Sequence, residues 1–500
     1  MARERLLSAT RPAPSSSMRS PLATRHATAP ERNAGTPRPI LTPMDATTTA
    51  PSRPQRGDEL DLRIDSLAYG GAGVARLGGY VVFVRDAVPG DRVRAVVTKR
   101  KRAYAEARAT EVLEPSPERV PAVADHPGAP WQVLPYERQL EVKAAQVDDA
   151  LRRIGHLDGF EREPIVPAVQ RWRYRNKLEY SFGTGPGGEL VCGFHAPGSW
   201  EEIVPIEECV LASERGNDAR RAALAWCRAQ RLRAYDRRSQ DGLLRNLVVR
   251  EGRRTGRLQV RLVTSDAEDL DLDGFAEATG ADSVLWTRAE GVGETTAGGQ
   301  TEVLRGTDWI EEQLTVAGAH LAIRISAEAF FQTNTEMAEV LYGAAAEYAG
   351  LQGWERVYDL FCGIGTIGLS LAPRAGELWG LEIVEDAIAD AIVNARRNEV
   401  GNARFFAGDV RLAMRDLVER AGRPDVLVVD PPRAGLSAKI VRRIAEAAPK
   451  RIVYVSCNPT TLAPNAAQLA EAGWALRRVR PVDMFPQTPH IECVALLERA

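Results

Sequence analysis

The chain has 500 residues, roughly two to three times the usual length of one domain, which predicts about three domains. Hydrophobic residues make up 44% and charged residues 26%, a composition that excludes collagen-like and wholly disordered proteins. The formal net charge of -2 excludes a protein that attracts nucleic acid over its whole surface, so any such site must be local.

Two features bear on the cellular compartment. No run approaches the roughly 18 apolar residues that a membrane-spanning helix requires, and the N-terminus carries charges where a signal peptide would be apolar. The six cysteines are scattered and include no Cys-X-X-Cys pair, so no disulfide framework is expected. We therefore expect a cytoplasmic protein with no membrane partner.

The N-terminal segment differs in composition from the rest. Residues 1–55 are rich in Pro, Ser, Thr, Ala and Arg and poor in large apolar residues, which predicts a disordered tail. An Arg- and Ser-rich, acid-poor start also fits a transit peptide, but prolines interrupt any amphipathic helix. Met44 is an alternative to Met1 as the initiator, because the preceding residues look structurally dispensable.

Residues 56–113 alternate apolar and polar residues between glycine-rich turns such as Tyr69 to Gly73, which predicts a small, OB-like β-barrel. Prolines 115, 117 and 121 mark a linker. Apolar residues then recur at helical spacing from Tyr136 to Ile154, and Gly155 is placed as a C-terminal cap. Residues 114–325 are thus predicted to hold a linker, a helix and a mixed α/β central domain.

Strands alternate with helices over residues 326–500. This alternation predicts an α/β fold with a doubly wound, Rossmann-like parallel sheet. The runs Trp474 to Val479 and Glu492 to Leu497 lie too close together for a helical crossover. They are therefore predicted to form an antiparallel pair at the edge of the sheet.

A glycine loop marks a cofactor site. Gly363, Gly365 and Gly368 form a G-X-G-X-X-G pattern between a predicted strand and helix, so a ligand could approach the backbone at Gly363. Glu382 ends the next strand, where a carboxylate can accept hydrogen bonds from a ribose. These features fit either a nicotinamide dinucleotide or S-adenosylmethionine. Asp359 favours the latter, because a carboxylate there can engage the methionine ammonium but would repel a pyrophosphate.

Two more acids end predicted strands. Asp430 follows Val426 to Val429, and the Pro431-Pro432 pair fixes the chain so that its carboxylate points into the crevice where ligands of such sheets bind. Asp409 follows Arg404 to Phe406, where it could meet the adenine amino group or instead cap the next helix.

Cys457 ends another predicted strand, a placement typical of reactive residues. Addition of a thiolate to C6 of a pyrimidine would make C5 nucleophilic toward a methyl sulfonium. A base must then remove the C5 proton. Glu492 is the favoured candidate, since a carboxylate in a dry crevice has a raised pKa, and His490 is the alternative.

Five ordered motifs resemble the RNA 5-methyluridine (uracil-C5) methyltransferase family. They are Phe331 to Asn334, Asp359 to Gly365, Asp430 to Arg433, Ser456 to Pro459 and His490 to Glu492. Residues 60–113 resemble the TRAM domain, an RNA-binding barrel found in members that act on 23S rRNA. The resemblance implies a class I methyltransferase fold with S-adenosylmethionine as cofactor. It assigns cofactor contacts to Gln332, Phe361, Glu382 and Asp430, the nucleophile to Cys457 and the proton acceptor to Glu492.

Many family members with a TRAM domain bind a [4Fe-4S] cluster through three closely spaced cysteines and a later one. Residues 120–139 contain no cysteine, and Cys209 alone resembles the fourth ligand. We therefore expect no iron-sulfur cluster and no other metal.

Structured RNA is the expected partner, either rRNA, which the TRAM resemblance favours, or tRNA. Contacts are predicted at Lys99 to Arg102 with Tyr104 and at Arg171 to Lys177, because these runs interleave basic and aromatic residues. Two alternatives stay open: a catalytically silent RNA-binding protein and a cytosine-C5 RNA methyltransferase. Cytosine-C5 methyltransferases resemble one another in a Pro-Cys pair after the fourth strand. This chain has Asp430-Pro431-Pro432 there and no cysteine, which argues against the cytosine alternative. We expect a monomer.

Overall fold

The computed structural model describes residues 53–266, 270–291, 293, 296 and 298–500. The tail predicted at 1–55 therefore lies almost wholly outside the described residues. Residues 51–500 form one compact unit. Within the described ranges, the helices are too short or too polar to cross a bilayer.

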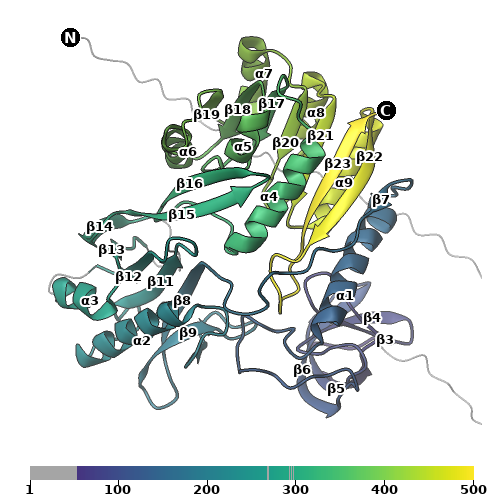
Figure 1. The fold of residues 1–500 in the computed structure, drawn as a ribbon. Coiled ribbons are helices and arrows are strands. Elements are labelled where there is room, and N and C mark those ends of the chain that lie inside the picture. The colour runs from purple at the N-terminus through teal and green to yellow at the C-terminus, as the bar shows by residue number, and fades with distance from the viewer. Residues whose placement is uncertain (1–52, 267–269, 292, 294–295, 297) are drawn as a thin grey trace, which may run out of the picture. The chain divides into compact units, whose positions relative to one another are not determined.

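The N-terminal part of this unit is a six-stranded sheet (Figure 1). Its strands are β1 (Glu59–Arg63), β2 (Ser66–Leu67), β3 (Gly73–Leu77), β4 (Tyr80–Arg85), β5 (Arg92–Arg100) and β6 (Tyr104–Glu114). The strand order is β1-β5-β6-β4-β3-β2, with only the β4–β6 pair parallel, and β1 also approaches β3. Alternate side chains such as Leu62, Val82 and Val93 meet in a core on one face.

The predicted helix between the two halves of the chain is α1 (Tyr136–Asp149), which continues as a π-helical turn over Ala150–Ile154. Gly155 is the C-terminal cap, as predicted, but its φ of -81° is open to any residue. The glycine is needed for another reason. A Cβ at Gly155 would lie 2.8 Å from the Leu151 carbonyl oxygen and 2.9 Å from that of Ala463, so this turn packs closely on α9 (Pro459–Glu471).

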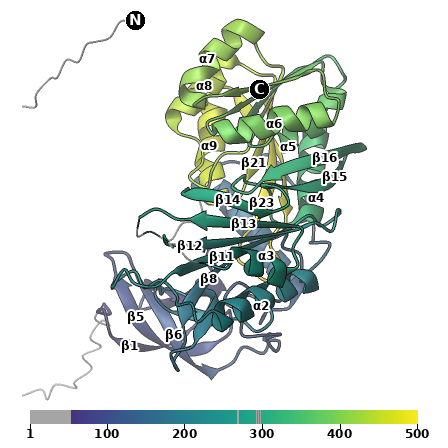
Figure 2. The same ribbon diagram turned by 90° about the vertical axis from the view of Figure 1, so that its left-hand side faces the viewer.

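The central region is built on a seven-stranded sheet in the order β10-β9-β8-β11-β12-β13-β14, and Figure 2 shows β8 and β11 to β14 side by side. Its strands are β8 (Lys177–Thr184), β9 (Leu190–His195), β10 (Ile203–Pro205), β11 (Leu244–Glu251), β12 (Leu258–Thr264), β13 (Ser283–Arg288) and β14 (Gln300–Arg305). Helices α2 (Glu214–Ala229) and α3 (Leu272–Thr279) pack on one face. The hairpin of β15 (Trp309–Val316) and β16 (Ala319–Ser326) instead shares a core with the C-terminal sheet.

The C-terminal sheet has eight strands in the order β19-β18-β17-β20-β21-β23-β22-β7. The first five are parallel, as predicted. They are β17 (Arg356–Leu360), β18 (Glu377–Glu382), β19 (Ala403–Ala407), β20 (Val426–Val429) and β21 (Arg451–Ser456). The predicted antiparallel pair forms as β22 (Trp474–Val482) and β23 (Glu492–Arg499), but β7 (Glu161–Arg162) adds a further strand outside β22.

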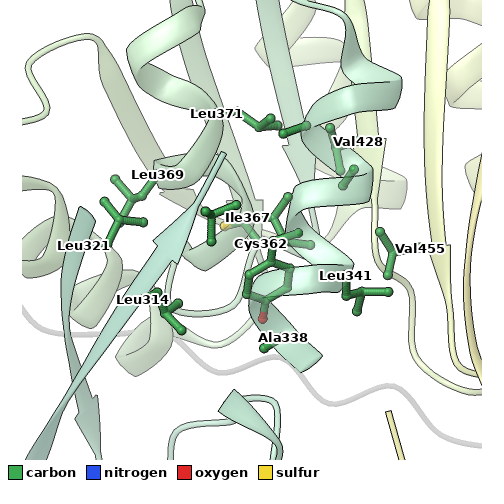
Figure 3. Close-up of a cluster of buried hydrophobic side chains, with 14 of the residues drawn as sticks. Leu314, Leu321, Ala338, Leu341, Cys362, Ile367, Leu369, Leu371, Val428 and Val455 are labelled. Atoms are coloured by element: carbon green, nitrogen blue, oxygen red, sulfur yellow. The ribbon is translucent and has the colours of Figure 1, made fainter. Parts of the chain in front are cut away.

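Helices cover both faces of this sheet because its strands are apolar on both faces. One core holds α4 (Thr335–Ala349), α5 (Thr366–Leu371) and α6 (Glu385–Arg397), and the other holds α7 (Val410–Ala421), α8 (Ala438–Ala447) and α9. Within β20, Val428 points into the first core and Val429 into the second. Figure 3 shows the first core, where Leu341 of α4 and Ile367 of α5 lie near Val428 and Val455.

Candidate active site

The predicted site residues follow neighbouring strands at one edge of the C-terminal sheet. Leu360 of β17 pairs with Leu381 of β18 and with Val429 of β20, and Val429 pairs with Tyr454 of β21. The residues that come next in the chain therefore leave the sheet side by side. They are Phe361, Glu382, Asp430 and the segment Ser456-Cys457. The sheet topology thus places these predicted residues at its carboxyl edge, where ligands of doubly wound folds bind.

The glycine loop is held by the acid that precedes it. Asp359 is fully buried, and its Oδ2 accepts a hydrogen bond of 2.9 Å from the Gly368 backbone N–H. Burial, with smaller contributions from Asp430 and Glu382, raises the pKa of Asp359 to about 7, although the hydrogen bond from Gly368 opposes this. Its Oδ1 is buried without a hydrogen-bond partner among the described residues. Asp359 therefore fixes the loop and keeps one carboxyl oxygen unused.

Positive φ angles bend the same loop. Phe361 has φ +62°, Gly363 has φ +52° and Gly365 has φ +85°, all in the left-handed region. A Cβ at Gly363 would meet nothing within 4 Å, so this glycine is needed for its backbone angle and leaves open space beside the chain. Glu382 closes the loop from the next strand, because its Oε2 lies 3.3 Å from the Gly363 backbone nitrogen and its Oε1 accepts from Ile383 and Val384 N–H.

Asp409 and Gln332 lie in different surroundings from the other predicted residues. Asp409 caps α7, accepts a 2.8 Å hydrogen bond from Arg411 N–H and is paired with the Arg411 guanidinium. Gln332 is buried just before α4, and its backbone oxygen accepts a 2.9 Å hydrogen bond from Asn176 of the central region. The structure thus displays the capping role for Asp409, while Gln332 lies where two regions of the chain meet.

The reactive pair is set by strand register. Ser456 of β21 pairs with Cys493 of β23, and these strands are antiparallel, so one further step places Cys457 opposite Glu492. Glu492 is 3% exposed, whereas Cys457 is partly exposed. Burial, together with the carboxyls of Glu492 and Asp430, raises the pKa of the Cys457 thiol to about 11.

The two carboxyls also perturb each other. Burial raises the pKa of Glu492 well above its usual range, Asp430 adds to this, and the Arg433 guanidinium opposes it. Asp430 keeps partial contact with solvent, yet its largely protein surroundings raise its pKa to about 7. Titratable groups with shifted pKa values in one crevice are typical of catalytic sites.

His490 lies beside Arg433, whose Nη2 donates a 2.7 Å hydrogen bond to His490 Nδ1. Burial, together with the charge of Arg433, lowers the pKa of His490 to about 4. The imidazole is therefore neutral at pH 7. Because an arginine can only donate, Nδ1 is the acceptor nitrogen and its lone pair is occupied.

Comparisons with known proteins decide the family. The tRNA (Uracil-5-)-methyltransferase family model matches residues 295–500, and the TRAM domain model matches residues 53–110. An RNA methyltransferase of Halalkalibacterium halodurans is 37% identical over 452 residues, which cover 89% of this chain and 97% of the relative. One of Bacteroides thetaiotaomicron is 38% identical over 461 residues, covering 86% and 100%.

A solved structure shows the same fold over almost its full length. The tRNA (uracil-54, C5)-methyltransferase of Pyrococcus abyssi, in complex with S-adenosyl-L-homocysteine, aligns with a TM-score of 0.71 and 29% identity, covering 87% of this chain and 99% of that one. The chain belongs to the RNA (uracil-5-)-methyltransferase family. The predicted enzyme class is thereby confirmed: it is an S-adenosylmethionine-dependent RNA (uracil-C5) methyltransferase with a TRAM domain.

The residues at the carboxyl edge fit S-adenosylmethionine. The unused Asp359 oxygen, the open space at Gly363 and the Glu382 carboxylate surround the glycine loop, and together they offer acceptors for an ammonium and a ribose. When bound there, the cofactor supplies an electrophilic methyl group on a sulfonium. The chain itself supplies these acceptors and, on a nearby strand end, the thiol of Cys457.

Sequence reasoning missed Tyr69, which comes from the TRAM domain. Its hydroxyl donates a 3.0 Å hydrogen bond to the backbone oxygen of Cys457. Burial raises its pKa to about 12, and Arg433, Cys457 and Glu492 are its titratable neighbours. Two residues further on, a Cβ at Gly71 would lie 2.9 Å from Pro489 Cβ, so the same turn also touches the segment before Glu492. The glycine-rich turn was visible in the sequence, but nothing in it indicated this contact.

The predicted RNA-contact runs differ in exposure. Lys99 to Arg102 are exposed, with Lys99 paired to Glu106 at 3.0 Å. In the second run, Tyr174 is fully buried and donates a 3.1 Å hydrogen bond to the Pro486 oxygen, so this member of the predicted RNA-contact run is not available to RNA. An aromatic residue between basic ones turned out to pack the core.

Cys209, the cysteine that resembles a cluster ligand, is buried with its Sγ 3.2 Å from His126 Nε2. Over the part of the chain that the structure describes, no three His, Cys, Asp or Glu side chains gather in a way that could hold a metal ion. The absence of an iron-sulfur cluster stays a prediction.

Proposed function

We propose that this enzyme methylates C5 of a uridine in structured RNA through a covalent bond between Cys457 Sγ and C6 of the base. The observation that carries the proposal is the β21–β23 register, which sets a partly exposed thiol opposite a buried carboxyl beside the glycine loop. The partly exposed thiol first gives up its proton to solvent, and the thiolate adds to C6, which makes C5 nucleophilic. C5 then takes the methyl group as the bond from that methyl to the sulfonium breaks. Removal of the C5 proton re-forms the C5–C6 double bond and breaks the C6–Sγ bond, which releases the cysteine.

Glu492 is the proposed proton acceptor. Its surroundings raise its pKa, so a proton is held more firmly there than on an exposed carboxylate. His490 is less suited, because its Nδ1 already accepts from Arg433 and the remaining Nε2 then carries the hydrogen. We assign His490 to orienting Arg433, which lies beside both Cys457 and Glu492.

For the cofactor, we propose that Glu382 binds the ribose, that Phe361, Gly363 and Asp430 line the methionine end, and that Gln332 contacts it from the start of α4. A role for Asp409 at the adenine would require its pair with Arg411 to open. The cytoplasmic location and the monomeric state stay predictions.

The RNA class is a proposal as well. The sequence favoured rRNA because of the TRAM resemblance, but the Pyrococcus abyssi relative is named for a tRNA position. We therefore propose a structured uridine target and include both RNAs in the test.

The test measures methyl transfer to unmodified tRNA and 23S rRNA transcripts. Cys457→Ala should abolish transfer while leaving S-adenosylmethionine affinity within a few-fold, and Cys227→Ala, at a buried thiol of the central domain, serves as the control. RNA containing 5-fluorouridine should form a denaturation-resistant adduct with the wild type only. Normal turnover by Cys457→Ala would refute the covalent mechanism, and methylation of cytosine would refute the base assignment.

A further inference from the structure

A second cavity lies on the central seven-stranded sheet, on elements that do not belong to the methyl-transfer site. It has a volume of about 290 Å³ and is bordered by β8, β9, β10, β11 and the loops beside them. The residues that matter for its chemistry are Trp200, Tyr235, Arg237, Arg238 and Arg245.

Among the described residues that line this cavity, three arginines stand against two acids. Of the two lining acids, Glu201 pairs with Arg238, and Asp236 accepts from the backbone N–H groups of Arg238 and Ser239. Arg245 is only 7% exposed and donates to the backbone oxygens of Gly291 and Gly293, which carry no full charge.

The Arg245 guanidinium is also incompletely satisfied. Its Nε is buried without a hydrogen-bond partner in the described ranges. Burial lowers the pKa of Arg237, and the nearby charge of Arg245 lowers it further, so two cations crowd one another here. Within the described ranges Arg245 is a buried cation that hydrogen-bonds to no carboxylate, and such a cation favours binding of an anion.

Aromatic rings accompany these cations. Trp200 is 52% exposed, an unusual state for tryptophan, and the guanidinium carbons of Arg237 and Arg238 lie 5.8 and 5.7 Å from its ring centroid. Arg245 lies 4.2 Å from the centroid of Tyr235. An exposed indole next to arginines can stack a base while the arginines hold its phosphate.

The cavity also adjoins the TRAM domain. A Cβ at Gly198, two residues before Trp200, would lie 2.8 Å from Nη1 of Arg85 at the end of β4. An RNA strand bound to the TRAM sheet could therefore continue into the cavity without leaving the protein surface.

We propose that this cavity binds one unpaired nucleotide of the RNA substrate, with its base on Trp200 and its phosphate near Arg237 and Arg245. The site would hold a nucleotide other than the uridine that reacts. The inference rests on the proposed function in one respect, namely that the substrate is structured RNA.

The test measures the Kd of the full chain for unmodified tRNA and 23S rRNA transcripts. Trp200→Ala should weaken binding of the preferred RNA by about tenfold, because stacking of one base is lost, while kcat at saturating RNA stays unchanged. Trp354→Ala is the matched control, since Trp354 is 61% exposed in the methyltransferase domain and also has a cation, Lys450, over its ring. Wild-type affinity of Trp200→Ala would overturn the proposal.

A second variant tests the proposed contact with the phosphate. Arg237→Ala should lower the slope of log Kd against log salt by about 0.7, whereas Trp200→Ala should leave the slope unchanged. Adenosine monophosphate should compete for the site better than inorganic phosphate at equal ionic strength, and equal competition would overturn base recognition. Loss of the proposed methyl-transfer mechanism would appear instead as turnover by Cys457→Ala, so the two failures are distinguishable.

Discussion

The two loops that carry the proposed nucleophile and base are held in different ways. The loop after β21 is fixed mainly by its neighbours, since Ser456 Oγ bonds to the backbone of Asn458 and the Asn458 side chain accepts from Thr460 N–H at 3.0 Å. The loop before β23, residues 483–491, is fixed by helix α1, more than three hundred residues earlier in the chain. There Lys143 Nζ lies 2.6 Å from Asp483 Oδ1, and both groups are fully buried.

Further contacts strengthen the second arrangement. Gln139 Nε2 donates to Gln487 Oε1 at 2.8 Å, and Gln487 N–H donates to Gln139 Oε1 at 2.9 Å. The hydroxyl of Tyr136 donates to Asp483 Oδ2 at 2.7 Å. The position of Cys457 thus depends mainly on a local turn, with one added hydrogen bond from Tyr69, whereas the position of Glu492 depends on docking of α1. The residues of one active site can therefore be positioned partly by a local sequence motif and partly by contacts with a distant helix.

The largest expected effect comes from the base itself. Glu492→Gln should lower kcat by about 10² to 10⁴, because general-base assistance is lost after the methyl group has moved. The methylated covalent complex should accumulate as a slowly migrating RNA–protein band that carries label from the cofactor methyl. His490→Ala is the control and should leave no such band. If the band appears for His490→Ala and not for Glu492→Gln, then His490 removes the C5 proton and Glu492 does not.

The sequence predicted the parallel-strand part of the site for a physical reason. Carboxyl ends of parallel strands meet at one edge, so Glu382, Asp430 and Cys457 could be placed together before any coordinates were known. The roles of Tyr69 and Lys143 could not be predicted from the sequence. Their hydrogen bonds span 388 and 340 residues and depend on how separate regions of the chain dock. Tyr174 was misplaced, because a basic and aromatic run does not reveal which side chain turns inward.

The next largest effect should come from the docking of α1. Lys143→Met leaves Asp483 buried and unpaired, which should lower the free energy of unfolding by about 3–5 kcal/mol in denaturant titration. Lys450→Met is the matched control, because Lys450 is mostly exposed and pairs with Asp425 at 3.0 Å, so its loss should cost about 0–1 kcal/mol. Lys143→Met combined with Asp483→Leu should recover part of the stability. Equal losses for Lys143→Met and Lys450→Met would show that the buried pair does not hold the loop.

The smallest effect should come from Tyr69, the contact that extends the comparison to the TRAM domain. Tyr69→Phe removes one hydrogen bond to the Cys457 backbone, worth about 1 kcal/mol, and should lower kcat about fivefold with the KM for RNA unchanged. Tyr80→Phe is a close control, since the Tyr80 hydroxyl donates to the Lys101 oxygen at 2.7 Å in the same domain but away from the crevice. Both variants should lose similar stability, because each loses one bond from a tyrosine hydroxyl to a backbone oxygen. A fall in kcat confined to Tyr69→Phe would show that Tyr69 positions the nucleophile. An equal fall in kcat for both variants would show that the Tyr69 hydrogen bond contributes only to stability.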